Sequence, residues 1–137
     1  MSQNDEKIKI PEEIVKDVND NLPGNLTMED IQQLFYGRRI KAVYYLSRDF
    51  MERDLAEADL SARPYHGLKR AGFNTVGDVM NAINSFDDLD RLRYLGKKSK
   101  HEIEGKLFFL HYSLLPKEKR KAYLKRFLEI NGITEEK

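Results

Sequence analysis

The short stretch LGKKS, residues 95–99, combines residue types that proteins use to bind phosphate. A glycine stands directly before two lysines and a serine, and a helical pattern with a glutamate follows. A helix N-terminus has backbone N–H groups without intrahelical acceptors and a partial positive charge, which together attract anions. Gly96 would let a phosphate approach that terminus closely, while Lys98 and Ser99 would add a charge and a hydroxyl donor. The simpler interpretation is a basic turn with exposed lysines, and the motif alone does not exclude it.

Few residues are arranged for catalysis or for metal binding. The sequence has no cysteine, which excludes thiol catalysis, disulfides and cysteine-ligated metal. It also has no nucleophile elbow, phosphate-loop motif or HExxH pair. His101 and His111 have no carboxylate four residues later, so we expect both to be surface or half-buried residues rather than metal ligands. We therefore expect no enzyme activity, no metal and no cofactor.

The elements that would position the phosphate motif can be predicted from helix start and stop signals. Pro11, at a first-turn position, and the break at Pro23 and Gly24 delimit a first helix. Thr27 is expected to cap a second helical run that continues to about Leu55, as one kinked helix or as two. No strand-like alternation exceeds a few residues, so the expected fold class is all-α. Further helices are expected over residues 59–72, 74–86, 86–96, 97–112 and 116–131, and Asn74 or Thr75 is expected to cap the second of these.

Charge is distributed unevenly, although the 137 residues together have a formal net charge of only +1. Residues 1–57 hold 8 basic and 12 acidic side chains, whereas residues 58–130 hold 15 basic and 9 acidic ones. An anionic partner is therefore expected to meet the C-terminal half, and ordinary solvated helix faces are the alternative. The last helix is expected to bury Tyr123, Leu124, Phe127 and Leu128. Its strongly basic remainder is ordinarily a solvated face, and the alternative is a second phosphate contact.

No apolar run approaches the roughly 18 residues needed to span a bilayer. The polar start MSQNDEKIK does not have the pattern of a secretory signal. The length corresponds to about one domain. A soluble, cytoplasmic protein is expected.

Two segments, DLSARPYHGLKRAGFNTVGDVM and LDRLRYLGKKSKHEIEGKL, resemble the C-terminal domain of the bacterial RNA polymerase alpha subunit. They contain Leu-Ser-x-Arg, Leu-Lys-Arg-Ala-Gly, Asn-Thr-Val and Leu-Gly-Lys-Lys-Ser with a following Glu-Ile, in that order. The resemblance covers about residues 56–112 and implies a compact bundle of short helices with helix-hairpin-helix elements. The expected layout is an acidic helical extension (1–55), the alpha-like domain (56–115) and a basic helix (116–131). The chain is too short for the family's large N-terminal domain, so a stand-alone protein is expected.

The family binds AT-rich upstream promoter DNA across the minor groove and contacts transcription activators. The resemblance therefore implies a non-enzymatic, transcription-related module that binds double-stranded DNA and is associated with the nucleoid. Arg63 is implied to reach into the minor groove, and Glu102 to orient a neighbouring cation or water. The implied DNA-binding residues are Arg63, His66, Gly67, Gly96, Lys98, Ser99 and Glu102. Pro64, His66 and Gly67 depart from the family pattern, and without the resemblance Arg63 is interpreted as a surface arginine at a helix start.

The alternative function is a protein–protein interaction module, with DNA binding lost or incidental. Its expected partner is a transcription activator, a sigma factor or another RNA polymerase component. The aromatic residues within residues 27–55 are expected to form core or a helix-docking face, which offers a groove for such a partner or for a homodimer. These residues are Phe35, Tyr36, Tyr44, Tyr45 and Phe50.

Overall fold

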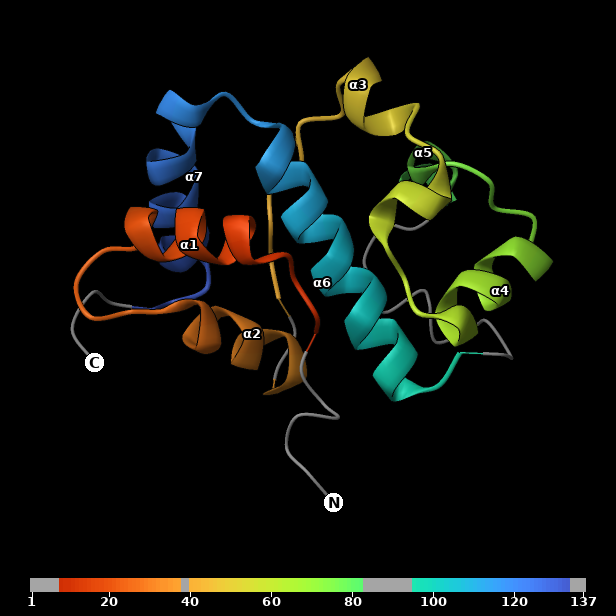
Figure 1. Ribbon diagram of the computed structural model, residues 1–137, viewed down its shortest axis with the longest axis horizontal. Helices are drawn as coiled ribbons and strands as arrows, with labels where there is room; N and C mark the ends of the chain where they lie inside the picture. The colour runs from red at the N-terminus through yellow and green to blue at the C-terminus, as the bar shows by residue number, and fades with distance from the viewer. Residues whose placement is uncertain (1–7, 38–39, 83–94, 134–137) are drawn as a thin grey trace. The chain divides into compact units, whose positions relative to one another are not determined.

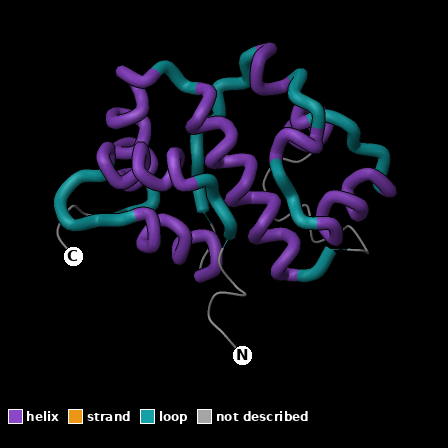
Figure 2. The backbone as a smooth tube through the Cα atoms, in the orientation of Figure 1, coloured by secondary structure: helices purple, strands orange, loops and turns teal. Residues whose placement is uncertain are grey.

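The structure, a computed structural model, describes residues 8–37, 40–82 and 95–133 (Figure 1). Within these ranges the regular structure is helical, and the β-type pairing is one isolated antiparallel bridge between Asp54 and Thr75 (Figure 2). The predicted all-α class is confirmed. The helices are α1 (Glu12–Asn21), α2 (Met28–Gly37), α3 (Arg48–Met51), the 3-10 helix η2 (Leu55–Ala58), α4 (Ala62–Arg70), α5 (Val76–Ala82), α6 (Lys97–Leu114) and α7 (Lys117–Ile130).

The protein forms two compact units whose borders differ from the predicted layout. The first unit combines Met1–Tyr44 with Tyr112–Lys137, and the second is Tyr45–His111. The N-terminal extension and the basic C-terminal helix therefore belong to one unit, although they lie at opposite ends of the sequence. Whether residues 56–115 fold by themselves stays a prediction.

In the first unit, α1 and α2 pack with α7. The ring of Phe35 in α2 stacks on that of Phe127 in α7, with ring centroids 6.3 Å apart. Asp17 of α1 accepts hydrogen bonds from the Tyr112 hydroxyl at 2.7 Å and from Arg120 Nη1 of α7 at 3.1 Å. The predicted buried face of the last helix is confirmed, because Tyr123, Leu124, Phe127 and Leu128 are all buried.

Several helix starts follow the predicted signals. Pro11 is the N-cap residue of α1. Thr27 precedes α2, and its backbone N–H donates to the Asp30 carboxylate at 2.8 Å. Thr75 precedes α5 and its hydroxyl oxygen accepts from the Asp78 N–H at 3.0 Å, while the Asp78 carboxylate accepts from the Thr75 N–H. These contacts satisfy backbone donors that have no acceptor within the helix.

The segment from residue 40 to residue 47 corrects the prediction of a helical run to Leu55, because it is not helical. Side chains from far along the sequence satisfy part of its backbone. Asn131 donates to the Lys41 carbonyl at 2.8 Å and accepts from the Lys41 N–H at 2.9 Å, and the Tyr123 hydroxyl donates to the Val43 carbonyl at 2.8 Å. Val43, Tyr44 and Tyr45 are also residue types that favour extended backbone. The predicted aromatic helix face over residues 27–55 is therefore not continuous.

In the second unit, the segment before η2 packs on α5. The Val76 N–H donates to the Arg53 carbonyl and the Leu55 N–H donates to the Asn74 carbonyl, both at 2.9 Å. A Cβ on Gly77 would lie 2.7 Å from the Met51 carbonyl oxygen, so this close approach of α5 to α3 requires glycine. Residues 45–55, which the predicted layout assigned to the extension, therefore belong to the second unit.

The expectation that His111 is a surface or half-buried residue is wrong, because only 2% of its surface is exposed. Its Nε2 accepts a hydrogen bond from the Tyr45 N–H at 2.8 Å, and the Phe50 ring packs edge-on against it with centroids 5.1 Å apart. Burial lowers the pKa of His111 from 6.5 to about 4. The ring is therefore a neutral core acceptor, which sequence spacing did not reveal.

The helix predicted over residues 86–96 falls largely outside the described residues, and so do the helix-hairpin-helix elements that depend on it. Across the described ranges, no helix has the length and apolar character needed to cross a bilayer.

Candidate nucleic-acid interface

Two helix N-termini of the second unit hold most of the predicted site residues. The first intrahelical hydrogen bonds run from the Tyr65 N–H to the Ser61 carbonyl in α4 and from the Lys100 N–H to the Gly96 carbonyl in α6, both at 3.1 Å. The backbone N–H groups before these two have no acceptor within their own helix. Each start therefore presents donors and a partial positive charge, which favour an anion.

Side chains of α6 hold the start of α4 in place. The Glu102 carboxylate accepts from the Ser61 N–H at 2.5 Å and from the Ser61 hydroxyl at 2.7 Å. One turn further along α6, Lys106 Nζ lies 3.3 Å from an Asp59 carboxylate oxygen. The starts of α4 and α6 lie side by side in Figure 1, as these contacts require. The Glu102–Ser61 and Lys106–Asp59 contacts thus bring the starts of α4 and α6 together, and the Glu102 carboxylate offsets part of the positive charge at the α4 start.

The two predicted cations at these ends are exposed, and no acid among the described residues neutralises them. Arg63 lies in the first turn of α4 and Lys98 in the first turn of α6. Neither makes a hydrogen bond or ion pair with the part of the protein that the structure describes. Lys98 precedes Glu102 by four residues, a spacing at which opposite charges can pair. The Glu102 carboxylate instead binds Ser61, so the Lys98 charge stays available.

The exposed face of α4 extends the cationic surface beyond Arg63. His66 lies one turn later and is exposed, with its ring edge-on to the Tyr65 ring at 5.4 Å. Lys69 and Arg70 follow on the same face, and α4 contains no acidic residue. Sequence reasoning missed both cations, although Arg70 lies seven residues after Arg63 and therefore shares its face.

Gly96 is not required by the fold of the described residues. A Cβ added there would meet no atom within 4 Å, and Gly96 is not among the glycines with positive φ. Neither packing nor backbone conformation therefore explains this glycine. An open space in front of the α6 N-terminus is compatible with the approach of another molecule.

Gly67 and Ser99 are positioned differently from the rest of the predicted set. Gly67 is buried on the inner side of α4, and Ser99 is only 6% exposed. Gly67 thus has a packing role in this structure, and Ser99 lies in the first turn of α6, where its backbone N–H has no intrahelical acceptor. Sequence reasoning also missed Ser61 as a site residue, although it lies in the Leu-Ser-x-Arg motif, directly before the α4 pattern.

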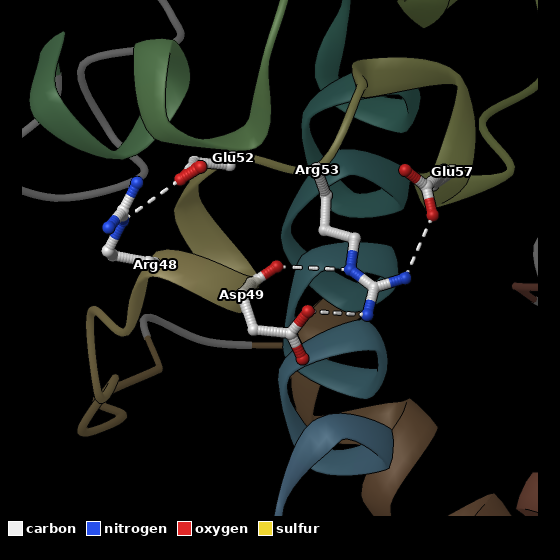
Figure 3. Close-up of a pocket in the computed structure, with 5 residues that line it drawn as sticks. All are labelled: Arg48, Asp49, Glu52, Arg53 and Glu57. Atoms are coloured by element: carbon white, nitrogen blue, oxygen red, sulfur yellow. Dashed lines mark hydrogen bonds and ion pairs between the residues drawn. The ribbon is translucent and has the colours of Figure 1, made fainter.

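A hollow of about 310 Å³ on α3 and η2 has a different character. Figure 3 shows Arg53 between Asp49 and Glu57, with ion-pair distances of 2.8 and 2.9 Å, and Arg48 beside Glu52 at 3.2 Å. Its arginines are thus paired with acids, unlike Arg63. The described residues also contain no group of three His, Cys, Asp or Glu side chains that could hold a metal.

Comparison with known families agrees with the resemblance noted above. Residues 46–108 match the family described as the C-terminal domain of the alpha subunit of bacterial RNA polymerase. This segment resembles the alpha C-terminal domain. The alpha-like segment, as we call residues 46–108, starts about ten residues before the predicted border and so includes α3, which agrees with the packing of α3 on α5.

The relatives are subunits named DNA-directed RNA polymerase subunit alpha, and the alpha-like segment is similar in sequence to one part of them. The relative from Clostridium beijerinckii is 51% identical over 57 residues, which are 42% of this protein and 18% of that subunit. The relative from Heliobacterium modesticaldum is 44% identical over 68 residues, which are 50% of this protein and 21% of that subunit. The matched part thus spans about a fifth of the length of these relatives. No solved structure matches the sequence.

Proposed function

We propose that the alpha-like segment binds double-stranded DNA in a transcription-related role, with the starts of α4 and α6 docked on the minor groove of AT-rich sequence. The proposal is carried by one observation: Glu102 joins the starts of α4 and α6, on which Arg63 and Lys98 are exposed and not neutralised by any described residue. The family match supports the same kind of partner.

The residues would act in two ways. Arg63 would enter the minor groove, which is narrow in AT tracts and therefore concentrates negative potential. The first-turn N–H groups of α6, together with Lys98, would bind a backbone phosphate next to Gly96. His66 would add a donor beside Arg63. No step of this binding requires a metal or a cofactor.

The decisive experiment compares AT-rich and GC-rich duplexes by fluorescence anisotropy, with the full-length protein and with its Arg63→Ala variant. Loss of a base-reading arginine is expected to cost about 1–3 kcal/mol on AT-rich duplex and to reduce the preference over GC-rich duplex. Lys98→Ala is expected to weaken binding to both duplexes by a similar factor and to reduce the log–log salt slope of binding by about 1.

Arg48→Ala is the matched control for Arg63→Ala. Arg48 also lies in the alpha-like segment and is exposed, but its side chain pairs with Glu52. The proposal predicts that the control binds AT-rich duplex as the unmodified protein does. If Arg63→Ala and Arg48→Ala bind equally well, the assignment of Arg63 is wrong.

A second candidate function is docking of a transcription regulator or an RNA polymerase component. It is favoured by two adjacent exposed apolar residues in the second unit, Tyr45 and Leu46, which are 58% and 55% exposed. Apolar contacts of this kind persist at high salt, whereas DNA binding weakens steeply between about 50 and 200 mM salt. Association with purified RNA polymerase that survives high salt, together with no duplex binding, would favour this candidate.

A further inference from the structure

Helix α7 lies outside the alpha-like segment and has a second set of exposed cations. Lys117, Lys121 and Lys125 follow each other at intervals of four residues, and Lys119 and Arg126 lie on the flank of the same exposed side. None of these five side chains has a hydrogen bond or ion pair with the residues that the structure describes. Glu118 and Glu129 are also exposed on α7, so cations outnumber carboxylates there by five to two.

The remaining cation of α7, Arg120, differs from these five because its side chain binds acceptors within the protein. Arg120 donates to the carbonyls of Leu115 and Ser113 and to the Asp17 carboxylate, at 3.1, 2.8 and 3.1 Å. Lys117 also helps to lower the pKa of Asp17, but Lys121 and Lys125 have no such role. Like charges at this helical spacing destabilise a helix, and an anionic partner would remove that cost.

We propose that this row of lysines on α7 binds the phosphate backbone of duplex DNA as a second, sequence-independent contact. Successive lysines in the row are about 6 Å apart along the helix axis, and DNA presents a dense and regular series of negative charges. The inference rests on the proposed function, since it adds a second surface for the same partner.

A membrane surface is the main competing partner of a basic helix. Helices that bind membranes insert an apolar face into the lipid interface. In α7 that face consists of Tyr123, Leu124, Phe127 and Leu128, and it is buried in the protein. The exposed side of α7 therefore offers charge and no large exposed apolar side chain, which fits a nucleic-acid backbone better than a bilayer.

The test measures affinity of the full-length protein for AT-rich duplex across 50–200 mM salt. The variant Lys121→Gln/Lys125→Gln removes two unpaired cations of α7 and keeps a strong helix-forming residue at each position. Its matched control, Lys16→Gln/Arg48→Gln, makes the same change in net charge at two cations that are paired with Asp20 and Glu52. Circular dichroism checks that both variants keep their helices.

The α7 variant is expected to lower the log–log salt slope by roughly 1.8, about 0.9 for each lost phosphate contact, while the control keeps the slope of the unmodified protein. Equal slopes for the two variants would overturn the inference. So would an α7 variant that binds DNA like the control but sediments less with phosphatidylserine vesicles, because α7 would then be a lipid-binding surface.

Parallel measurements with Arg63→Ala separate the two proposals. If Arg63→Ala weakens duplex binding, and the α7 variant and its control have the same salt slope, only the α7 contact is overturned. If the α7 variant weakens duplex binding and Arg63→Ala does not, the minor-groove proposal is overturned and the α7 contact is supported. Absence of any duplex binding by the unmodified protein overturns both.

Discussion

Glu102 illustrates how a single acidic residue can determine the charge available at a site. Its carboxylate accepts hydrogen bonds from the N–H and the hydroxyl of Ser61. It therefore connects the starts of α4 and α6 without pairing with Lys98, four residues before it. If the carboxylate paired with Lys98 instead, it would neutralise that cation, and the start of α4 would lose its contact with α6. Whether Lys98 keeps its charge available therefore depends on which group donates to Glu102. That group is Ser61, which lies 41 positions earlier in the sequence.

Gly96→Ala tests the open space in front of α6. Since an added Cβ meets nothing within 4 Å, we expect unchanged or slightly raised stability, by at most about 1 kcal/mol, together with weaker DNA binding. Gly77→Ala is the opposite case, because its Cβ would lie 2.7 Å from the Met51 carbonyl oxygen, and a loss of about 1–3 kcal/mol is expected. Urea unfolding and duplex titration measure the two effects. Unchanged duplex affinity of Gly96→Ala would remove this glycine from the proposed interface.

His111 makes stability depend on pH between its ordinary pKa of 6.5 and its lowered pKa of about 4. Above pH 6.5 the ring is neutral in both the folded and the unfolded protein, so it contributes no pH dependence. As the pH falls below 6.5 only the unfolded protein gains the proton, and the free energy of unfolding decreases by about 1.4 kcal/mol per pH unit until about pH 4.

His111→Phe should keep the ring packing against Phe50 but lose the acceptor for the Tyr45 N–H. We expect it to be about 1 kcal/mol less stable at pH 7.5 and to lose less stability than the unmodified protein between pH 6.5 and 5. Urea unfolding at several pH values measures this. Parallel pH profiles for both proteins would show that another group causes the acid sensitivity.

At the scale of elements, α1 is held against α7 by a polar contact in addition to apolar packing. Burial alone would raise the pKa of Asp17, but hydrogen bonds from Tyr112 and Arg120 and the charges of Arg120 and Lys117 outweigh burial, so the pKa is lowered. Because its folded pKa lies below the ordinary value of 3.8, Asp17 contributes stability above that pH and loses it as the pH falls further.

Asp17→Asn should therefore destabilise the protein by about 1–2 kcal/mol at neutral pH and increase hydrogen exchange in α1. Asp20→Asn is the matched control on the same helix, because among the described residues Asp20 pairs only with the exposed Lys16. Asp20→Asn is expected to change the free energy of unfolding by no more than about 0.5 kcal/mol. Equal losses for the two variants would mean that the Asp17 contacts add nothing beyond a surface ion pair.

At the scale of the whole molecule, the unit that contains the proposed site begins before the helices that form it. Residues 45–55 contribute the buried side chains Phe50 and Leu55 to that unit, and the bridge between Asp54 and Thr75 joins them to α5. The two ends of the sequence fold together as the other unit, so α7 depends for its packing on residues that precede the alpha-like segment.

We expect the fragment 45–115 to unfold cooperatively and to retain AT-rich duplex binding. The fragment 56–115 lacks Phe50 and Leu55, whose burial is worth about 1.5–3 kcal/mol each, and should be much less stable. Thermal unfolding followed by circular dichroism compares the two fragments. Equal melting temperatures would show that residues 45–55 are not part of the folded unit.

Local signals in the sequence determined where most helices begin and which face of the last helix is buried. Pro11, Thr75 and the apolar spacing around Tyr123 act over one or two turns, so their effect can be predicted without the fold. The sequence also determined the family resemblance, since the motifs are contiguous.

Only the tertiary structure decided the features that depend on distant partners. Residues 40–47 are not helical, and Asn131 and Tyr123, which satisfy part of their backbone, lie 80 to 90 positions away. His111 is buried against Phe50, and the Tyr45 N–H, 66 positions earlier, donates to its ring. Glu102 binds Ser61 rather than Lys98 for the same reason: local spacing shows which groups can pair, whereas packing determines which of them meet.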